Sequence, residues 1–193
     1  MKVLGINGSH RKESSTEFFL KKALKICENE GHQTEMISLH DKEIKHCTVC
    51  NLCSTKFACP QKDDMWPLID KMAAADAIII ATPTYFASVS GKLKNFFDRS
   101  LPLRRNGMKL KNKVGGAIAS GASRNGGQEI ACQQIISWMH LQEMVTVVDA
   151  GTAHFGGIAW VPRGSMPEDD KIGIETSESL GRKIAEVLNL LNR

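Results

Sequence analysis

The feature that most constrains the fold is the alternation of short apolar runs with longer amphipathic segments along the chain. The pattern predicts strands at residues 2–7, 33–39, 77–81, 113–120 and 143–149. Apolar residues at helical spacing predict helices at residues 16–31, 64–75, 90–98, 127–140 and 172–191. Strands that alternate with helices in this way form a parallel sheet with helices on both faces. The sequence therefore predicts an α/β protein.

The number of predicted strands narrows the topology. Five strands favour a doubly wound sheet in the order 2-1-3-4-5 over a six-stranded dinucleotide-binding sheet. A chain of 193 residues fits a single domain, which we expect to span residues 1–193 with an insertion at about residues 40–63 after the second strand. Ligands of such sheets bind at the carboxyl ends of the strands. The loops at residues 8–16, 82–91 and 120–128 are therefore the candidate site.

Composition excludes several classes of protein. The chain has 25 Lys and Arg against 21 Asp and Glu, and the net charge of +4 is too small to indicate a nucleic-acid-binding protein. No apolar run reaches the roughly 18 residues that a membrane helix needs, and Gly5, Asn7 and Gly8 interrupt any signal-peptide pattern at the N-terminus. We therefore expect a cytoplasmic protein that binds neither nucleic acid nor membrane.

The first loop joins a strand to a helix and combines hydroxyl groups with cations. Free N–H groups and the dipole at a helix N-terminus favour an anion. The loop has neither the Walker pattern nor G-x-G-x-x-G, so a monophosphate is favoured over a dinucleotide pyrophosphate. A helix cap with a solvated basic turn explains the same residues equally well. The candidate phosphate ligands are Ser9, His10, Arg11, Ser15 and Thr16.

The other two loops offer an aromatic pair and a run of small residues. Aromatic side chains beside Pro, Thr and Ser form a flat wall suited to a planar heterocycle, although a turn with aromatics packed on the core is the alternative. The candidates here are Pro83, Thr84, Tyr85, Phe86 and Ser88. Small residues let the backbone approach a ligand closely. A simple turn before a helix uses the same residues and is the alternative interpretation. The candidates in this loop are Ser120, Gly121, Arg124, Asn125, Gly126 and Gly127.

Four of the six cysteines lie close together, at Cys47, Cys50, Cys53 and Cys59. Their spacing is similar to the bacterial ferredoxin run C-x2-C-x2-C-x3-C-P, with a longer final spacer before Pro60. Structural disulfides are rare in the cytoplasm. The alternatives to an iron–sulfur cluster are a zinc site, reactive thiols that form disulfides transiently, and inert thiols. The other two cysteines lie within helical patterns and are interpreted as buried structural thiols.

The three loops together resemble the NADPH-dependent FMN reductase superfamily of flavodoxin-like proteins. The resemblance rests on residues 8–16, the run from Pro83 to Arg99, and residues 120–127, and it covers nearly the whole chain. It implies FMN, with the phosphate on Ser9, Arg11, Ser15 and Thr16, the isoalloxazine ring against residues 83–88, and the third loop closing over the ring. His10 and Ser15 depart from the proline and asparagine that many relatives carry.

A flavodoxin-like domain with these cysteines after its second strand resembles the iron–sulfur flavoprotein family. The resemblance implies a [4Fe–4S] cluster on Cys47, Cys50, Cys53 and Cys59. It also implies a homodimer or homotetramer in which the cluster of one subunit lies near the flavin of another. The apolar stretch at residues 152–160 offers surface for such association.

The leading functional hypothesis is an FMN-dependent oxidoreductase that exchanges electrons between FMN and the cluster. Its partner would be a ferredoxin-like protein, NAD(P)H or a small acceptor. No separate catalytic side chain is nominated, because the cofactors carry out the redox chemistry. One alternative is an NAD(P)H-dependent FMN or quinone reductase without a cluster. The other is a zinc-stabilised binding domain without redox function.

Overall fold

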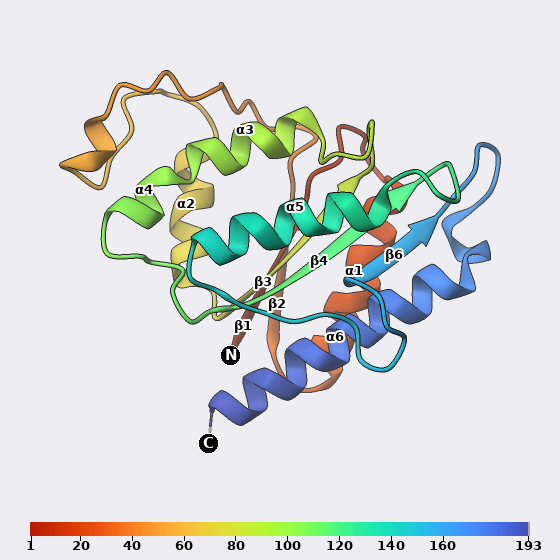
Figure 1. The fold of residues 1–193 in the computed structure, drawn as a ribbon. Coiled ribbons are helices and arrows are strands. Elements are labelled where there is room, and N and C mark those ends of the chain that lie inside the picture. Colours follow the sequence, from red (N-terminus) through yellow and green to blue (C-terminus); the bar gives the residue numbers. More distant parts are fainter. Residues whose placement is uncertain (193) are drawn as a thin grey trace.

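The computed structural model describes residues 1–192, which form a parallel sheet flanked by helices (Figure 1). The strand order β2-β1-β3-β4-β5 confirms the predicted order, and each strand runs parallel to its neighbours. The central strands are almost entirely buried, as their continuous apolar sequences require. The strands are β1 (Lys2–Asn7), β2 (Gln33–Ser38), β3 (Ala77–Pro83), β4 (Val114–Gly121), β5 (Val145–Thr146) and β6 (Gly157–Trp160).

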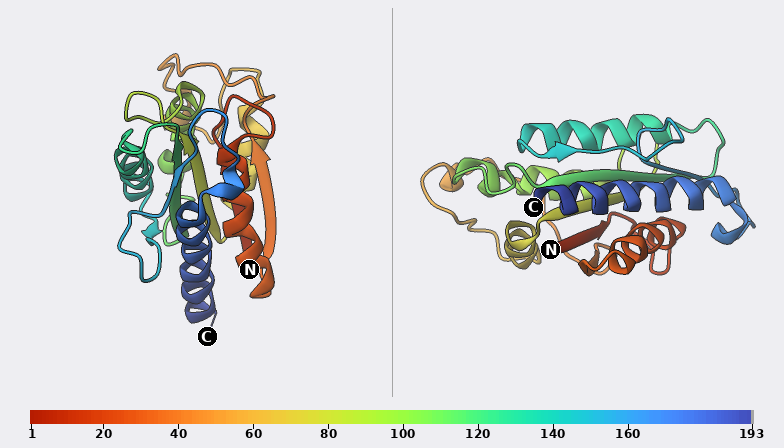
Figure 2. Two further views of the ribbon diagram at one scale, coloured as in Figure 1. Left: turned by 90° about the vertical axis from the view of Figure 1, so that its right-hand side faces the viewer. Right: turned by 90° about the horizontal axis from the view of Figure 1, so that it is seen from below.

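Helices cover both faces of the sheet and divide the core into two parts (Figure 2). On one face lie α1 (Ser15–Asn29) and α6 (Lys171–Leu191). On the other lie α2 (Met65–Ala74), α3 (Gly91–Arg99), α4 (Leu101–Arg105) and α5 (Gln128–Leu141). Two short 3-10 helices lie at Leu52–Ser54 and Pro167–Asp169. None of the helices in the described part of the chain is long and apolar enough to cross a membrane.

Three of the helices begin at polar caps, and two of these caps also bond a strand or the loop that follows β1. Ser14 caps α1 by accepting a hydrogen bond from the N–H of Glu17. Ser90 caps α3 and donates its hydroxyl proton to the carbonyl oxygen of Gly8 at 2.6 Å. Asp170 caps α6 and also accepts a hydrogen bond from the N–H of Trp160 at 2.6 Å. The Ser90 and Asp170 caps therefore fix where α3 and α6 start relative to the carboxyl ends of the strands.

The fifth position of the sheet is shared by two short strands, where the sequence predicts one strand at residues 143–149. β5 pairs with the start of β4, and β6 pairs with its end. Between them the carboxylate of Asp149 accepts hydrogen bonds from the N–H groups of Thr152 and His154, at 3.1 and 2.8 Å. This loop turns the chain away from the sheet before it returns at β6. The stretch expected to offer apolar surface thus contributes residues 157–160 to the sheet itself.

The helices α1 and α6 pack closely because a glycine lies at their contact. A side chain at Gly181 would come within 2.5 Å of the carbonyl oxygen of Ala23. The Cys27 thiol lies at the same contact and donates a hydrogen bond to the Gly181 carbonyl at 3.5 Å. Cys132 is likewise buried, on α5. Both cysteines therefore have the structural environment that the sequence predicts.

The return of the chain to the sheet depends on Gly156, and we expect substitution there to be costly. Its φ is +141°, and an added Cβ would lie 2.1 Å from the carbonyl oxygen of Ala117. The Gly156→Ala protein should lose more free energy of unfolding than the roughly 1–2 kcal/mol that a left-handed backbone alone costs an L-residue. Gly31→Ala is the matched control, because Gly31 has a φ of +86° but open space around it. Urea unfolding of both variants measures the difference, and equal losses would contradict this account.

Candidate functional site

The three loops predicted to form the site meet at the carboxyl edge of the sheet. The N–H of Gly8 donates to the carbonyl of Ala81 at 2.7 Å. The Thr84 N–H donates to the carbonyl of Ser120 at 2.8 Å. The hydroxyls of Thr16 and Ser120 are hydrogen-bonded at 2.7 Å in a buried position. Each loop is therefore bonded to another across the switch point of the sheet.

A cleft of about 840 Å³ opens where these loops meet. Its volume lies within the range of roughly 300–1,000 Å³ that is usual for small-molecule and cofactor sites. The first loop lines it from Arg11 to Ser15, the second loop from Pro83 to Tyr85, and the third loop from Ser120 to Ala122. Residues 161–168 and three residues of α1, Glu17, Phe18 and Lys21, line the rest.

One end of the cleft has the features of an anion site. The helix α1 begins there at Ser15, and the first N–H groups of a helix have no partner within it. Arg11 and Lys12 line the same part of the cleft. Buried Ser9 holds the loop in shape, because its hydroxyl accepts a hydrogen bond from the N–H of Arg11 at 3.1 Å. Helix N–H groups and two cations together suit a phosphate group.

The wall of the cleft ends in a tight turn of unusual composition. Tyr85 and Ser88 exchange backbone hydrogen bonds of 3.0 Å, and the two residues between them, Phe86 and Ala87, have φ values of +50° and +56°. Such values are uncommon outside glycine, and strained turns are typical of ligand sites. Gln134 of α5 supports the turn by accepting a hydrogen bond from the Ser88 hydroxyl at 2.9 Å. The Gln134 side chain therefore helps to hold the turn in place.

One residue that lines the cleft carries a buried polar atom without a hydrogen-bond partner in the described part of the chain. The Oγ1 of Thr84 is buried and has no hydrogen-bond partner among residues 1–192. Buried hydroxyl groups are normally hydrogen-bonded, so an atom of this kind at a cleft calls for a partner from outside the chain. A ligand with polar ring edges fits this requirement.

The predicted binding residues fall into two groups. Those that line the cleft are Arg11, Ser15, Pro83, Thr84, Tyr85, Ser120 and Gly121. The others surround it: the His10 ring lies 6.1 Å from that of Tyr85, the Phe86 side chain is fully exposed, and Arg124 stacks over the Trp160 ring at 4.7 Å. The second group of predicted residues is Ser9, His10, Thr16, Phe86, Ser88, Arg124, Asn125, Gly126 and Gly127.

Sequence reasoning missed the segment at residues 161–168, which includes Arg163. This segment follows β6, and the prediction of a strand at residues 143–149 placed the carboxyl end of the last strand too early in the sequence. The short apolar run of residues 157–160, followed by Pro162 and Gly164, is the signal that would have found it. The same rule that selected the other loops then selects this one.

Polar side chains along α3 hold the start of the cysteine segment. Lys92 donates hydrogen bonds to the carbonyls of residues 39, 40 and 42, at 2.9, 3.1 and 3.0 Å. Asn95 donates to the carbonyl of Ile44 at 3.2 Å, and Arg99 to that of Lys45 at 3.0 Å. The start of the cysteine segment therefore follows one face of α3 to its C-terminal end.

The cysteine segment is anchored there by a buried ion pair. Arg99 donates two hydrogen bonds to the Asp63 carboxylate, at 2.6 and 3.0 Å, and both side chains are at most 2% exposed. Burial alone raises the pKa of a carboxyl group. The Arg99 guanidinium and the N–H groups of Lys45 and Met65 outweigh that effect and hold the pKa of Asp63 below its usual range. The carboxylate thus joins both arms of the segment to α3.

All four cysteines of the segment line one pocket of about 90 Å³. Two arginines line the same pocket and contact two of the thiols. The guanidinium of Arg99 lies 3.5 Å from the Sγ of Cys59, and that of Arg105 lies 3.4 Å from the Sγ of Cys53. The four predicted metal ligands therefore share one pocket with two hydrogen-bond donors. Among residues 1–192, no three His, Cys, Asp or Glu side chains are arranged to hold a single metal ion.

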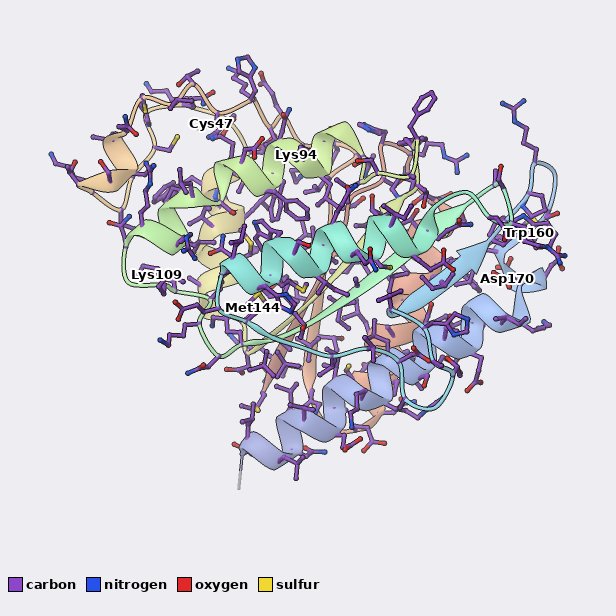
Figure 3. All side chains as sticks on the ribbon, viewed as in Figure 1. Cys47, Lys94, Lys109, Met144, Trp160 and Asp170 are labelled. Carbon is purple, nitrogen blue, oxygen red and sulfur yellow. The ribbon has the colours of Figure 1, made fainter. Side chains whose placement is uncertain are left out.

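The first loop contacts the N-terminal end of α3, and the cysteine segment contacts its C-terminal end and extends beyond it (Figure 1). Ser90 caps the N-terminal end of α3 and bonds the first loop, whereas Arg99 closes the C-terminal end beside Cys59. Nine residues of helix span about 13 Å. Figure 3 shows Cys47 and Trp160, the last residue of β6, on opposite sides of the molecule.

Comparison with known proteins agrees with this geometry. The family model described as NADPH-dependent FMN reductase matches residues 1–156. An iron–sulfur flavoprotein from Methanocaldococcus jannaschii is 46% identical, with the match covering 100% of both chains. The chain belongs to the iron–sulfur flavoproteins of the FMN reductase family. A second such protein, from Methanosarcina thermophila, is 40% identical over 100% of this chain and 98% of its own.

Solved structures of other proteins have a similar fold. A flavodoxin, WrbA-like protein from Agrobacterium tumefaciens superimposes with a TM-score of 0.66 at 17% identity, covering 98% of this chain and 97% of that one. The fold is therefore flavodoxin-like, as the sequence predicts. As a member of this family, the protein is a flavin-dependent oxidoreductase.

The ion pair at the base of the cysteine segment should contribute strongly to stability. Asp63→Asn leaves Arg99 buried without its counter-charge, which costs about 3–5 kcal/mol of unfolding free energy. Glu175→Gln removes an exposed ion pair with Arg182 and should cost less than about 1 kcal/mol. Urea unfolding of the two variants at pH 7 compares these losses.

The same pair predicts a pH dependence. Because the folded pKa of Asp63 is lowered, its contribution is complete above the unfolded pKa of about 3.9 and is lost as pH falls through the folded value. Wild-type stability should therefore fall more steeply than that of Asp63→Asn below about pH 4. Parallel curves for the two proteins would contradict this assignment.

The six cysteines should separate into two groups by reactivity. Burial raises the pKa of the Cys27 thiol to about 12 and also raises that of Cys132. In reduced, metal-free native protein, iodoacetamide should modify the four cysteines of the segment and spare these two. Unfolded protein should carry all six adducts. Peptide mass spectrometry distinguishes the patterns, and adducts on Cys27 or Cys132 in native protein would contradict the prediction.

Proposed function

We propose that the cleft at the carboxyl edge of the sheet binds FMN. The phosphate would lie at the N-terminus of α1 with Arg11 and Ser15, and the isoalloxazine ring would lie against residues 83–85. The anion site, the unsatisfied Thr84 hydroxyl and the cleft volume support this assignment. Ser9 and Thr16 would keep the loops in place, since both bond neighbouring loop atoms.

We further propose that Cys47, Cys50, Cys53 and Cys59 hold a [4Fe–4S] cluster. The observation that carries this proposal is that one pocket is lined by all four cysteines and by two arginines. Thiolate ligands carry negative charge, and N–H donors to the sulfurs are a recognised means of tuning cluster potentials. Arg99 and Arg105 are placed to supply such donors. The iron–sulfur names of the relatives support the same assignment.

The two assignments together define an electron-transfer function. FMN supplies one- and two-electron chemistry, and a cluster of this kind exchanges single electrons. The chain itself would bind and orient both groups, and limit the access of water to the ring. We propose that electrons pass to or from a ferredoxin-like partner or a small acceptor.

Association of copies would complete this arrangement. Within one chain the cleft and the cysteine pocket are separated by the length of α3. A homodimer or homotetramer that places the cysteine pocket of one copy beside the cleft of another shortens that path. Sedimentation equilibrium of the loaded protein tests this proposal.

An NAD(P)H-dependent FMN or quinone reductase is the second candidate function. It is favoured by the match to a family described as NADPH-dependent. Steady-state oxidation of NAD(P)H by the purified protein, undiminished when Cys53 is replaced by Ser, would support this candidate over the first. Reduction by a one-electron donor without consumption of NAD(P)H would support the first candidate.

Cofactor analysis of anaerobically purified protein tests the leading proposal. We expect about four irons, about four acid-labile sulfides and about one FMN per chain. The Cys53→Ser variant should lose iron and sulfide but keep FMN, because its cysteine lies far from the cleft. Cys132→Ser is the matched control and should retain all three. Flavin without iron in wild-type protein would overturn the cluster, and iron without flavin would overturn the FMN site.

A further inference from the structure

The turn at the wall of the cleft has a shape that its own residues disfavour. Phe86 and Ala87 have φ values of +50° and +56°, whereas two-residue turns with positive φ are normally formed by Asn and Gly. For an L-residue, one left-handed backbone costs the equivalent of roughly a 10-fold change in an equilibrium constant. The Phe86 ring does not offset this cost by burial, because it is fully exposed. Contacts from other parts of the chain must therefore hold the turn.

Backbone bonds fix the two ends of the turn. The N–H of Thr84 donates to the carbonyl of Ser120 at 2.8 Å, on β4. The N–H of Ser90 donates to the hydroxyl oxygen of Thr82 at 3.1 Å. Neither bond involves the two residues with positive φ, so the ends alone do not determine the shape of the tip.

The side chain of Gln134, on α5, reaches the tip. Its Oε1 accepts hydrogen bonds from the Ser88 hydroxyl at 2.9 Å and from the Val89 N–H at 3.1 Å. Its Nε2 donates to the carbonyl of Ala87 at 3.4 Å. Val89 is buried, and a buried N–H requires a partner, which Gln134 provides. One side-chain amide therefore bonds three consecutive residues of the turn and the segment that follows it.

The start of α5 supports the same turn. Gly127 packs directly on Ala87, and a side chain at residue 127 would come within 2.4 Å of the Ala87 Cβ. Gly127 and Gln134 are seven residues apart, about two helical turns, so both lie on one face of α5. The helix that follows the third loop of the cleft thus also holds the turn of the second loop.

We propose that Gln134 is a positioning residue for FMN, which keeps the strained turn in its binding shape before the cofactor arrives. This inference rests on the proposed function, because FMN must occupy the cleft. Without the Gln134 amide, the turn relaxes toward an unstrained backbone and Tyr85 moves from the cleft wall. FMN must then restore the strained shape as it binds, and the free energy used in this way is lost from its affinity.

Paired substitutions on α5 test the proposal. Gln134→Leu removes the three hydrogen bonds but keeps a side chain of similar size. Gln142→Leu is the matched control, because Gln142 lies at the other end of α5 and bonds the Ser100 hydroxyl. The FMN dissociation constant of the full-length protein is measured anaerobically, from the fluorescence of flavin released when loaded protein is diluted.

The two variants should differ in FMN affinity, whatever stability each loses in urea unfolding. Gln134→Leu should bind FMN at least about 10-fold more weakly than wild type, because the turn is no longer preformed. Gln142→Leu should stay within about 2-fold of wild type, since its side chain shares no partner with the turn. Equal affinities of wild type and Gln134→Leu would overturn the proposal, as would equal weakening by both substitutions.

A double-mutant cycle separates positioning from general destabilisation. Ala87→Gly lets residue 87 adopt a positive φ at little cost, so the turn depends less on Gln134. In this background, Gln134→Leu should weaken FMN binding by less than about 3-fold. Ala153→Gly is the matched control, because Ala153 has a φ of +60° in a different loop. Gln134→Leu should keep its full effect there, and an equal loss in the two backgrounds would contradict the positioning role.

The same measurements distinguish this proposal from the proposed function. Wild-type protein that binds no FMN would reject both. FMN that binds wild type and Gln134→Leu equally tightly would leave the FMN site standing and reject only the role of Gln134.

Discussion

The buried ion pair between Arg99 and Asp63 is the interaction on which the arrangement of both sites depends. A cysteine-rich segment without regular strands or long helices has little core of its own, so its position must be fixed from outside. Arg99 fixes it to the end of α3, where the guanidinium also contacts Cys59. At the other end of the same helix, Ser90 bonds Gly8 of the first loop. One helix of nine residues thus positions both candidate cofactor sites.

The two sites use different physical means to hold their ligands. The cleft uses what a parallel sheet provides at its carboxyl edge: helix N–H groups, small residues and strained turns. The cysteine pocket uses side chains alone, namely four thiols backed by two guanidinium groups. The cysteine segment lies between β2 and α2, and the strands before and after it both belong to the parallel sheet.

The sequence predicts the sheet well and the details of the site less well. Continuous apolar runs such as residues 77–81 identify buried strands, because such runs are hydrophobic on both faces. The interruption at Asp149 was not predictable from periodicity, since it depends on side-chain hydrogen bonds to the backbone three and five residues later. Because of that loop, the sheet ends at β6 and not at residue 149. The segment at residues 161–168, which follows β6, was therefore not predicted to line the site.

The roles of Arg99 and of the Phe86–Ala87 turn were also beyond sequence reasoning. An arginine at the end of an amphipathic helix is usually solvated, and nothing in its sequence neighbourhood indicates a carboxylate 36 residues away. Two-residue turns with positive φ are normally recognised by Asn-Gly or Asp-Gly, which this chain does not have at that place. The four cysteines were found because their spacing alone is informative, and the structure adds that they share one pocket.

We propose that one chain carries an iron–sulfur centre and a flavin at opposite ends of α3. Anomalous diffraction at the iron absorption edge, from anaerobically grown crystals of the loaded protein, tests it most directly. We expect iron density inside the ring of Cys47, Cys50, Cys53 and Cys59, beside Arg99 and Arg105, with flavin density in the cleft at the carboxyl edge. A single non-iron metal in that pocket, disulfide-linked cysteines, or flavin density away from the cleft would contradict the account.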